Sequence, residues 1–165
     1  MRKSWILMVL CLFLTGCSST EVFETLGNVE HEGGETAVMA PVSLKLPEQA
    51  AAEAFSGEEG TLYECEGYTL VLQTVAAGDF ARTVKALSGF QPEKLTILES
   101  RTGQAKRYDW VWTAAGEDGD LLCRATVLDD GKYHYCLSAV AAAKEAGSLT
   151  AHWNELFGSF CLGSD

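Results

Sequence analysis

Cys17 is the residue of this chain whose surroundings point most directly to a chemical reaction. It follows the small residue Gly16, which comes shortly after an apolar run at residues 5–14 that Arg2 and Lys3 precede. A cysteine thiol is a nucleophile and can therefore be modified covalently. The run has the roughly 7–15 residues of a signal-peptide core and falls short of the roughly 20 that span a bilayer. The stretch therefore predicts export.

The stretch Leu14-Thr15-Gly16-Cys17 resembles a bacterial lipobox. The resemblance implies that the Cys17 thiol takes a diacylglyceryl group and that a lipoprotein signal peptidase cuts between Gly16 and Cys17. Residues 1–16 would then be a signal peptide, and membrane lipid would be the partner of Cys17. Two acyl chains on one residue give stable anchoring, whereas one chain binds only marginally. The alternatives are an ordinary cleaved signal and an uncleaved N-terminal helix.

The residue after the cysteine bears on location. Ser18 stands there, in the place of the Asp that retains such lipoproteins in an inner membrane. We therefore expect the protein to be lipid-anchored at the cell membrane and to face outside the cytoplasm. Where the envelope has two membranes, we expect it in the outer one.

The charge of the chain is strongly acidic and unevenly spread. The net charge is −11, and residues 17–60 contain nine glutamates and one lysine. A nucleic-acid-binding surface needs a basic footprint, so nucleic acid is excluded as a partner. We interpret 17–60 as the lipidated cysteine followed by an acidic, mostly flexible tether, and 61–165 as a single globular domain.

Two parts of the tether carry weak structural signals. Residues 38–47 are moderately apolar and could dock on the domain as an extended strand. Pro47 could begin a short helix that runs to residue 55, because proline suits the first helical position.

The first half of the domain predicts a hairpin and a helix. Strand-forming residues fill 62–65 and 68–74, and the pair Glu66-Gly67 between them is typical of a tight turn. Asp79 is a good N-cap for the helix that follows, and Gly89 is a good residue for its C-terminal end.

The second half predicts four strands and a closing helix. The strands are expected at 94–100, 106–115, 121–129 and 132–140. Asp130-Gly131 joins the last two, and a two-residue turn there would place Asp129 opposite Lys132. The helix is expected to begin with Ser148 as its N-cap and to pack on the sheet through an apolar stripe, formed by Leu149, Trp153, Leu156, Phe157 and Phe160.

The predicted fold class is therefore α+β. Its element order is β-β-α-β-β-β-β-α, with an antiparallel sheet covered by helices in an α/β sandwich. From Tyr63 onward, the hairpin set and the closing pattern Trp153, Leu156-Phe157 and Phe160 resemble the PsbP-like fold. That fold hosts no single chemistry, so the resemblance implies an architecture and not an activity.

Four cysteines remain for the exported domain, because Cys11 would leave with the signal. They are Cys65, Cys123, Cys136 and Cys161. Export permits disulfides, and four cysteines allow three fully paired connectivities. Their spacing matches neither a redox C-x-x-C nor a zinc pattern, so bridges and buried thiols both remain open.

A row of aromatic residues is the candidate ligand surface. Tyr108, Trp110 and Trp112 alternate onto one face of a predicted strand. An exposed row of this kind can stack on sugar rings or peptide, whereas a core face under a helix needs the same residues.

Other polar groups are weaker candidates. His134 shares a predicted face with Cys123 and Cys136, which would suit a metal or a Cys–His pair, but no carboxylate partner is evident. The acids Glu117, Asp118 and Asp120 lack the EF-hand order, and His152 and Glu155 lie on the polar face of the last helix. We predict no catalytic residue, metal or cofactor.

The sequence thus favours a membrane-anchored extracytoplasmic lipoprotein that acts as a non-enzymatic binding or structural module of the cell envelope. The partner (protein, peptide or small ligand) stays open. The alternative is an envelope-associated, hydrolase-like enzyme whose site is built from residues distant in sequence.

The anchor yields the first prediction. Cys17→Ala removes the thiol that forms the thioether, so radiolabelled palmitate should no longer be incorporated into the protein in its native host. The parent chain, expressed in parallel, should be labelled. Unchanged labelling of the variant would refute the lipoprotein interpretation.

Overall fold

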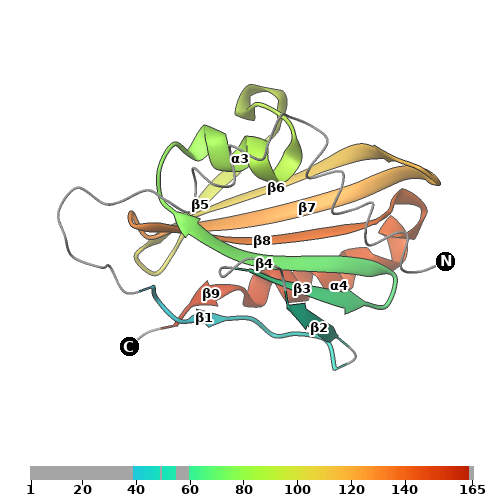
Figure 1. Ribbon diagram of the computed structural model, residues 1–165, viewed down its shortest axis with the longest axis horizontal. Coiled ribbons are helices and arrows are strands. Elements are labelled where there is room, and N and C mark those ends of the chain that lie inside the picture. The colour runs from blue at the N-terminus through green and yellow to red at the C-terminus, as the bar shows by residue number, and fades with distance from the viewer. Residues whose placement is uncertain (1–38, 49, 55–59, 164–165) are drawn as a thin grey trace.

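An antiparallel sheet of seven strands is the centre of the computed structural model (Figure 1). Residues 39–48, 50–54 and 60–163 are described, so the signal peptide, Cys17 and the tether before residue 39 lie outside them. The strands are β2 (Ala51–Ala54), β3 (Gly60–Cys65), β4 (Tyr68–Ala76), β5 (Leu98–Thr102), β6 (Ala105–Gly116), β7 (Gly119–Asp129) and β8 (Tyr133–Ala142). Their spatial order is β2-β3-β4-β8-β7-β6-β5.

Two helices cover the two faces of this sheet (Figure 1). Helix α3 (Phe80–Ser88) packs on one face and helix α4 (Ala146–Ser159) on the other. Short 3₁₀ turns, η1 (Pro92–Lys94) and η2 (Ala143–Glu145), precede β5 and α4. Strand β1 (Val42–Ser43) pairs with β9 (Cys161–Leu162) in a separate two-stranded sheet. The α+β prediction is confirmed.

Local sequence signals account for the first hairpin and the first helix. Gly67 has φ +82° in the turn between β3 and β4, a backbone conformation that side-chain-bearing residues rarely adopt. The Asp79 carboxylate accepts a hydrogen bond from the Ala81 N–H at 3.0 Å. Gly89 has φ +78° and ends α3. The predicted caps of this helix are therefore confirmed.

One expectation about the segment before the domain is confirmed, the docking of residues 38–47 as seen over 39–48, and one is corrected, the helix after Pro47. Residues 39–48 belong to the fold, because Ala40, Val42, Leu44 and Leu46 pack against the core on the α4 side. We call residues 39–48 the N-terminal segment. The helix expected over 47–55 is absent at residues 51–54, which form β2 beside β3. Pairing with an existing strand satisfies backbone groups that an isolated short helix would leave open.

Three details of the second half also differ from expectation. β5 begins at Leu98, since η1 occupies the start of the predicted strand. Asp129 lies opposite His134 and not Lys132, so the predicted register is wrong by two residues, although both versions place the same residues on each face. α4 begins at Ala146, and the Ser148 hydroxyl donates to the Glu145 carbonyl instead of capping the helix.

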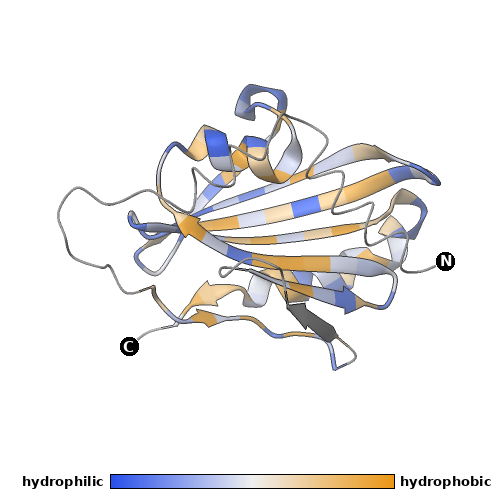
Figure 2. Cartoon of the chain, viewed as in Figure 1, coloured by the Kyte–Doolittle hydropathy of each residue, from blue (hydrophilic) through white to orange (hydrophobic). Residues whose placement is uncertain are grey.

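Alternating side chains divide the core into two halves, one on each face of the sheet. Hydrophobic residues recur along the strands that contribute to both halves (Figure 2). The half under α4 includes the buried stripe predicted for that helix, at Leu149, Trp153, Leu156, Phe157 and Phe160. The half under α3 includes Val84 and Leu87 of the helix and the apolar residues of β6 and β7. Burying both faces is what a sheet of this composition requires.

A buried hydrogen bond joins α3 to the sheet. The Thr83 hydroxyl lies 2.8 Å from Nδ1 of His134, and His134 is only 2% exposed. Burial lowers the pKa of His134 below its ordinary value of 6.5, and the nearby carboxylates of Asp129 and Asp130 partly oppose this effect. His134 is therefore neutral in the folded protein at pH 7.

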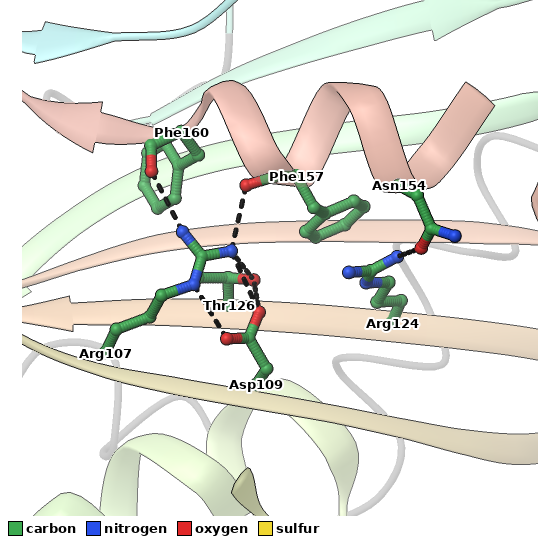
Figure 3. Close-up of polar contacts among 7 residues, drawn as sticks. All are labelled: Arg107, Asp109, Arg124, Thr126, Asn154, Phe157 and Phe160. Atoms are coloured by element: carbon green, nitrogen blue, oxygen red, sulfur yellow. Dashed lines mark hydrogen bonds and ion pairs between the residues drawn. The ribbon is translucent and has the colours of Figure 1, made fainter. Parts of the chain in front are cut away.

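A polar network joins the C-terminal end of α4 to β6 and β7 (Figure 3). The Arg107 guanidinium donates to the carbonyls of Phe157 at 2.9 Å and Phe160 at 3.0 Å. It also forms two hydrogen bonds with the Asp109 carboxylate, at 2.7 and 3.0 Å. Thr126 donates to the same carboxylate. A cation here adds donors for the carbonyls at the helix end and interacts favourably with the negative end of the helix dipole.

Removing the Arg107 guanidinium should destabilise the fold strongly. Arg107→Met removes the charged partner of the Asp109 carboxylate and the side-chain donor to the Phe157 and Phe160 carbonyls, at a site where the Arg107 and Asp109 side chains are 12% and 22% exposed. We expect a loss of about 2–4 kcal/mol in the free energy of unfolding. The measurement is urea unfolding.

The matched control is Arg82→Met, because Arg82 is exposed on α3. It should change stability by less than about 0.5 kcal/mol. Replacing Asp109 as well, in Arg107→Met/Asp109→Leu, should recover part of the loss because no unpaired charge remains. Equal stabilities of Arg107→Met and Arg82→Met would contradict the assigned role.

The lowered pKa of His134 predicts a pH dependence of stability. Below pH 6.5 the unfolded chain takes up a proton that the folded protein resists, so stability falls as pH falls through this range. One such group contributes at most about 1.4 kcal/mol per pH unit. Urea unfolding at a series of pH values should show a smaller slope for His134→Gln. Equal slopes for His134→Gln and the parent chain would contradict this role of His134.

Candidate functional site

The aromatic row on β6 is buried. Tyr108, Trp110 and Trp112 are 9%, 2% and 8% exposed and lie in the core under α3. The ring of Phe80, at the start of α3, lies 4.0 Å from the ring of Tyr108. This placement corrects the interpretation of the row as a ligand surface: the residues form the core face that a covering helix needs.

The His–Cys group is also part of the core. Cys123 and Cys136 face α3, but they lie opposite Val140 and Val127, so they are further apart along the hairpin than predicted. Both are free thiols, and burial raises the pKa of Cys123 to about 12. The Thr83 hydroxyl is hydrogen-bonded to Nδ1 of His134. Within the described residues, no group of three or more His, Cys, Asp or Glu side chains is placed to hold a metal ion.

A pocket of about 410 Å³ lies where the β3–β4 turn meets the first turns of α4. We call it the Tyr68 pocket. Its lining comes from the turn, the helix and the end of the N-terminal segment: Pro47, Cys65, Glu66, Gly67, Tyr68, Glu145, Ser148, Leu149 and His152. Its volume lies in the range of sites for small ligands, roughly 300–1,000 Å³.

The fold explains why these residues meet. Cys65 and Tyr68 are paired across the tight turn, which brings their side chains together at the end of the hairpin. His152 lies on α4, one helical turn after Ser148, and therefore on the same side of the helix. Leu149 and Trp153 hold this part of α4 against the sheet, and the Trp153 ring lies edge-on to the ring of Tyr68 at 5.8 Å.

Tyr68 is the polar centre of the pocket. Its hydroxyl lies 2.8 Å from Nε2 of His152, and it also bonds to the Cys65 thiol. Tyr68 is 7% exposed, and burial raises its pKa well above the usual range. The phenol therefore stays protonated at neutral pH and acts as a hydrogen-bonding group.

The Cys65 thiol is not an activated nucleophile. Burial raises its pKa, and the hydrogen bond with Tyr68 opposes this only in part. A catalytic Cys–His pair needs a low cysteine pKa and contact between the two side chains. Here Tyr68 bonds to both Cys65 and His152. The arrangement suits recognition through hydrogen bonds better than nucleophilic attack, which weakens the hydrolase alternative at this site.

The lining charges have one sign. Glu66 and Glu145 are both acids, and neither lysine nor arginine lines the pocket within the described residues. Positively charged or hydrogen-bond-donating groups are therefore favoured as ligands. The sequence left Cys65 open as half of a bridge or a buried thiol and placed His152 on a solvated face, and it did not bring the two together because the residues of the pocket are far apart in the chain. No short motif could have found them.

Glu155, the acid that follows His152 on α4, contacts the N-terminal segment and not the pocket. Glu155 forms an ion pair with Lys45 of the N-terminal segment, which lowers the pKa of Glu155. Lys45 also donates its backbone N–H to the Ser159 hydroxyl at 2.9 Å. The segment therefore runs along α4 toward the pocket.

Neither helix in the described part of the chain combines the length and the apolar character that a membrane span requires.

Comparison with known proteins identifies the fold. No protein-family model and no curated protein sequence matches the chain. Among solved structures, cyanobacterial PsbP (CyanoP) from Synechocystis sp. PCC 6803 is similar with a TM-score of 0.56 and 10% identity, over 83% of this chain and 100% of that one. A protein from Bacteroides thetaiotaomicron VPI-5482 is similar with a TM-score of 0.53 and 11% identity, over 78% of this chain and 48% of that one.

A third similar structure is LpqN of Mycobacterium tuberculosis, described as involved in cell envelope biogenesis. Its TM-score is 0.50 at 13% identity, over 80% of this chain and 88% of that one. At these identities the likeness concerns the fold alone. The chain has a PsbP-like fold, as the pattern of hairpins and closing helix predicted.

Proposed function

We propose that this protein is a lipid-anchored, extracytoplasmic binding module of the cell envelope, and that its ligand binds in the Tyr68 pocket. The lipobox-like stretch ending at Cys17 supports the anchor. The fold it shares with LpqN, a protein involved in envelope biogenesis, supports the location. The observation that carries the binding role is the pocket itself, with Tyr68 and His152 at its centre and two glutamates in its lining.

The chemistry of the lining defines the class of ligand. Glu66 and Glu145 favour a group such as an ammonium, while Tyr68 and His152 offer hydrogen bonds beside them. The apolar surface of Leu149 and Pro47 adds contact area. We therefore infer a small ligand, or the end of a peptide, that carries a positively charged or hydrogen-bond-donating group.

The N-terminal segment links the anchor to the pocket. It packs its apolar side chains against the α4 side of the core and contributes Pro47 to the lining. The pocket is complete only when the segment is docked, because Pro47 supplies part of its wall. Pro47 thus connects the ligand site to the chain that follows Cys17.

Site-specific crosslinking tests this function. A photoreactive amino acid is placed at Ser148, which is exposed in the pocket, in the full chain expressed in the native host. Ultraviolet light should yield an adduct of discrete mass, and adding Glu145→Gln should lower its yield because a carboxylate that attracts the ligand is lost.

The control position is Arg82, exposed on α3 and on the opposite face of the sheet. It should give no such adduct. The same adduct from both positions, or none from Ser148, would contradict ligand binding in the Tyr68 pocket.

A further inference from the structure

Strand β5 forms one edge of the sheet (Figure 1). Within residues 39–48, 50–54 and 60–163, its outer side has no partner strand. Thr102 pairs with Ala105 across a two-residue turn. The two residues that flank such a turn form a hydrogen-bonded pair, so the backbone groups of Thr102 point toward β6. The alternation along an antiparallel strand then directs the backbone groups of Glu99 and Arg101 outward. Such an edge is a template for another strand.

The side chains of β5 have a charge pattern that is complementary to itself when the strand is reversed. Glu99 and Arg101 flank Ser100, and all three are exposed. Neither charged side chain has a polar partner among the described residues. Both lie on the face toward α3, because Glu99 is opposite Tyr108 and therefore shares its side of the sheet.

We propose that β5 pairs with β5 of a second copy of this chain, antiparallel and centred on Ser100. In that register Glu99 lies opposite the second copy's Arg101, and by symmetry the same pair forms again. Ser100 lies opposite its own counterpart, and Leu98 lies opposite the second copy's Thr102. Opposite charges that face each other across strands stabilise antiparallel pairing, whereas like charges oppose it.

The hydrogen-bonding pattern agrees with this register. Glu99 and Arg101 both direct their backbone groups outward, so each opposes a residue that does the same. The two-fold symmetry makes the contact self-complementary and closed, as in most homodimers. The sheets of the two copies would then be continuous through the contact.

Exposed apolar side chains beside the edge also favour a contact there. Leu98 is 67% exposed and Val111 is 54% exposed, and they share the sheet face toward α4. Pairing would place a second strand next to Leu98 and reduce this exposure. The net charge of −11 opposes association of the copies in general, so a contact needs local charge pairing of the kind that β5 offers.

A cysteine on the predicted symmetry axis tests the pairing. Ser100→Cys is introduced into the full chain in the native envelope, and a mild oxidant is added. Residues that face each other in a non-hydrogen-bonded pair have Cα atoms about 4.5 Å apart, which suits a disulfide. We expect a reducible species of twice the protein mass, above the background of the parent chain with its own cysteines.

Leu98→Cys is the register control. In the proposed dimer the two copies of this position lie about four residues apart along the strands, or roughly 13 Å, which is too far for a disulfide. It should therefore stay at background. Equal yields from Ser100→Cys and Leu98→Cys, or no dimer from Ser100→Cys, would overturn the proposal. So would capture of a different protein by the introduced cysteine in place of the second copy.

Charge reversal gives an independent check. Two single reversals, Glu99→Arg and Arg101→Glu, are each made in the Ser100→Cys background. Either one places like charges opposite each other at both symmetric positions, so the disulfide yield should fall by roughly tenfold. The double reversal, Glu99→Arg with Arg101→Glu, should restore the yield because both pairs form again. Lys94→Glu changes the net charge by the same amount as Arg101→Glu, but outside β5, and should leave the yield unchanged. Failure of the double reversal to restore it would overturn the proposed register.

Discussion

Arg107 on β6 reaches the last carbonyls of α4, and the placement of that helix determines much of the structure around it. The sheet has an apolar face that α4 must cover, and the guanidinium joins the helix end to Asp109 and Thr126 of the sheet. β9 follows directly after this helix end and pairs with β1. The N-terminal segment then runs along α4, so its position depends on the same network.

The Tyr68 pocket lies at the opposite end of the same helix. Its walls are the first turns of α4, the β3–β4 turn and Pro47. A single helix thus positions a structural network at its C-terminal end and the candidate site at its N-terminal end. Raised pKa values at Cys65 and Tyr68 keep both groups neutral, so the acids of the lining dominate the charge of the site.

The sequence predicted those features that depend on neighbouring residues. The Asp79 cap, the turn at Gly67 and the apolar stripe of α4 are local patterns, and the structure contains all three. What depends on distant contacts was not predictable. Lys45 meets Ser159 across 114 residues of chain, and neither the strand at 51–54 nor the shared pocket of Cys65 and His152 leaves a periodic signal. The register after Asp129 depended on a turn length that Asp130-Gly131 alone does not set.

The central proposal is that this PsbP-like domain works from a lipid anchor at the outer side of a membrane. The most direct test is the mass of the N-terminal peptide of the protein extracted with detergent from the envelope of its native host. A lipid anchor predicts a chain that begins at Cys17 and carries a diacylglyceryl group on its sulfur. A chain that keeps residues 1–16, or one in which Cys17 carries a free thiol, would contradict it.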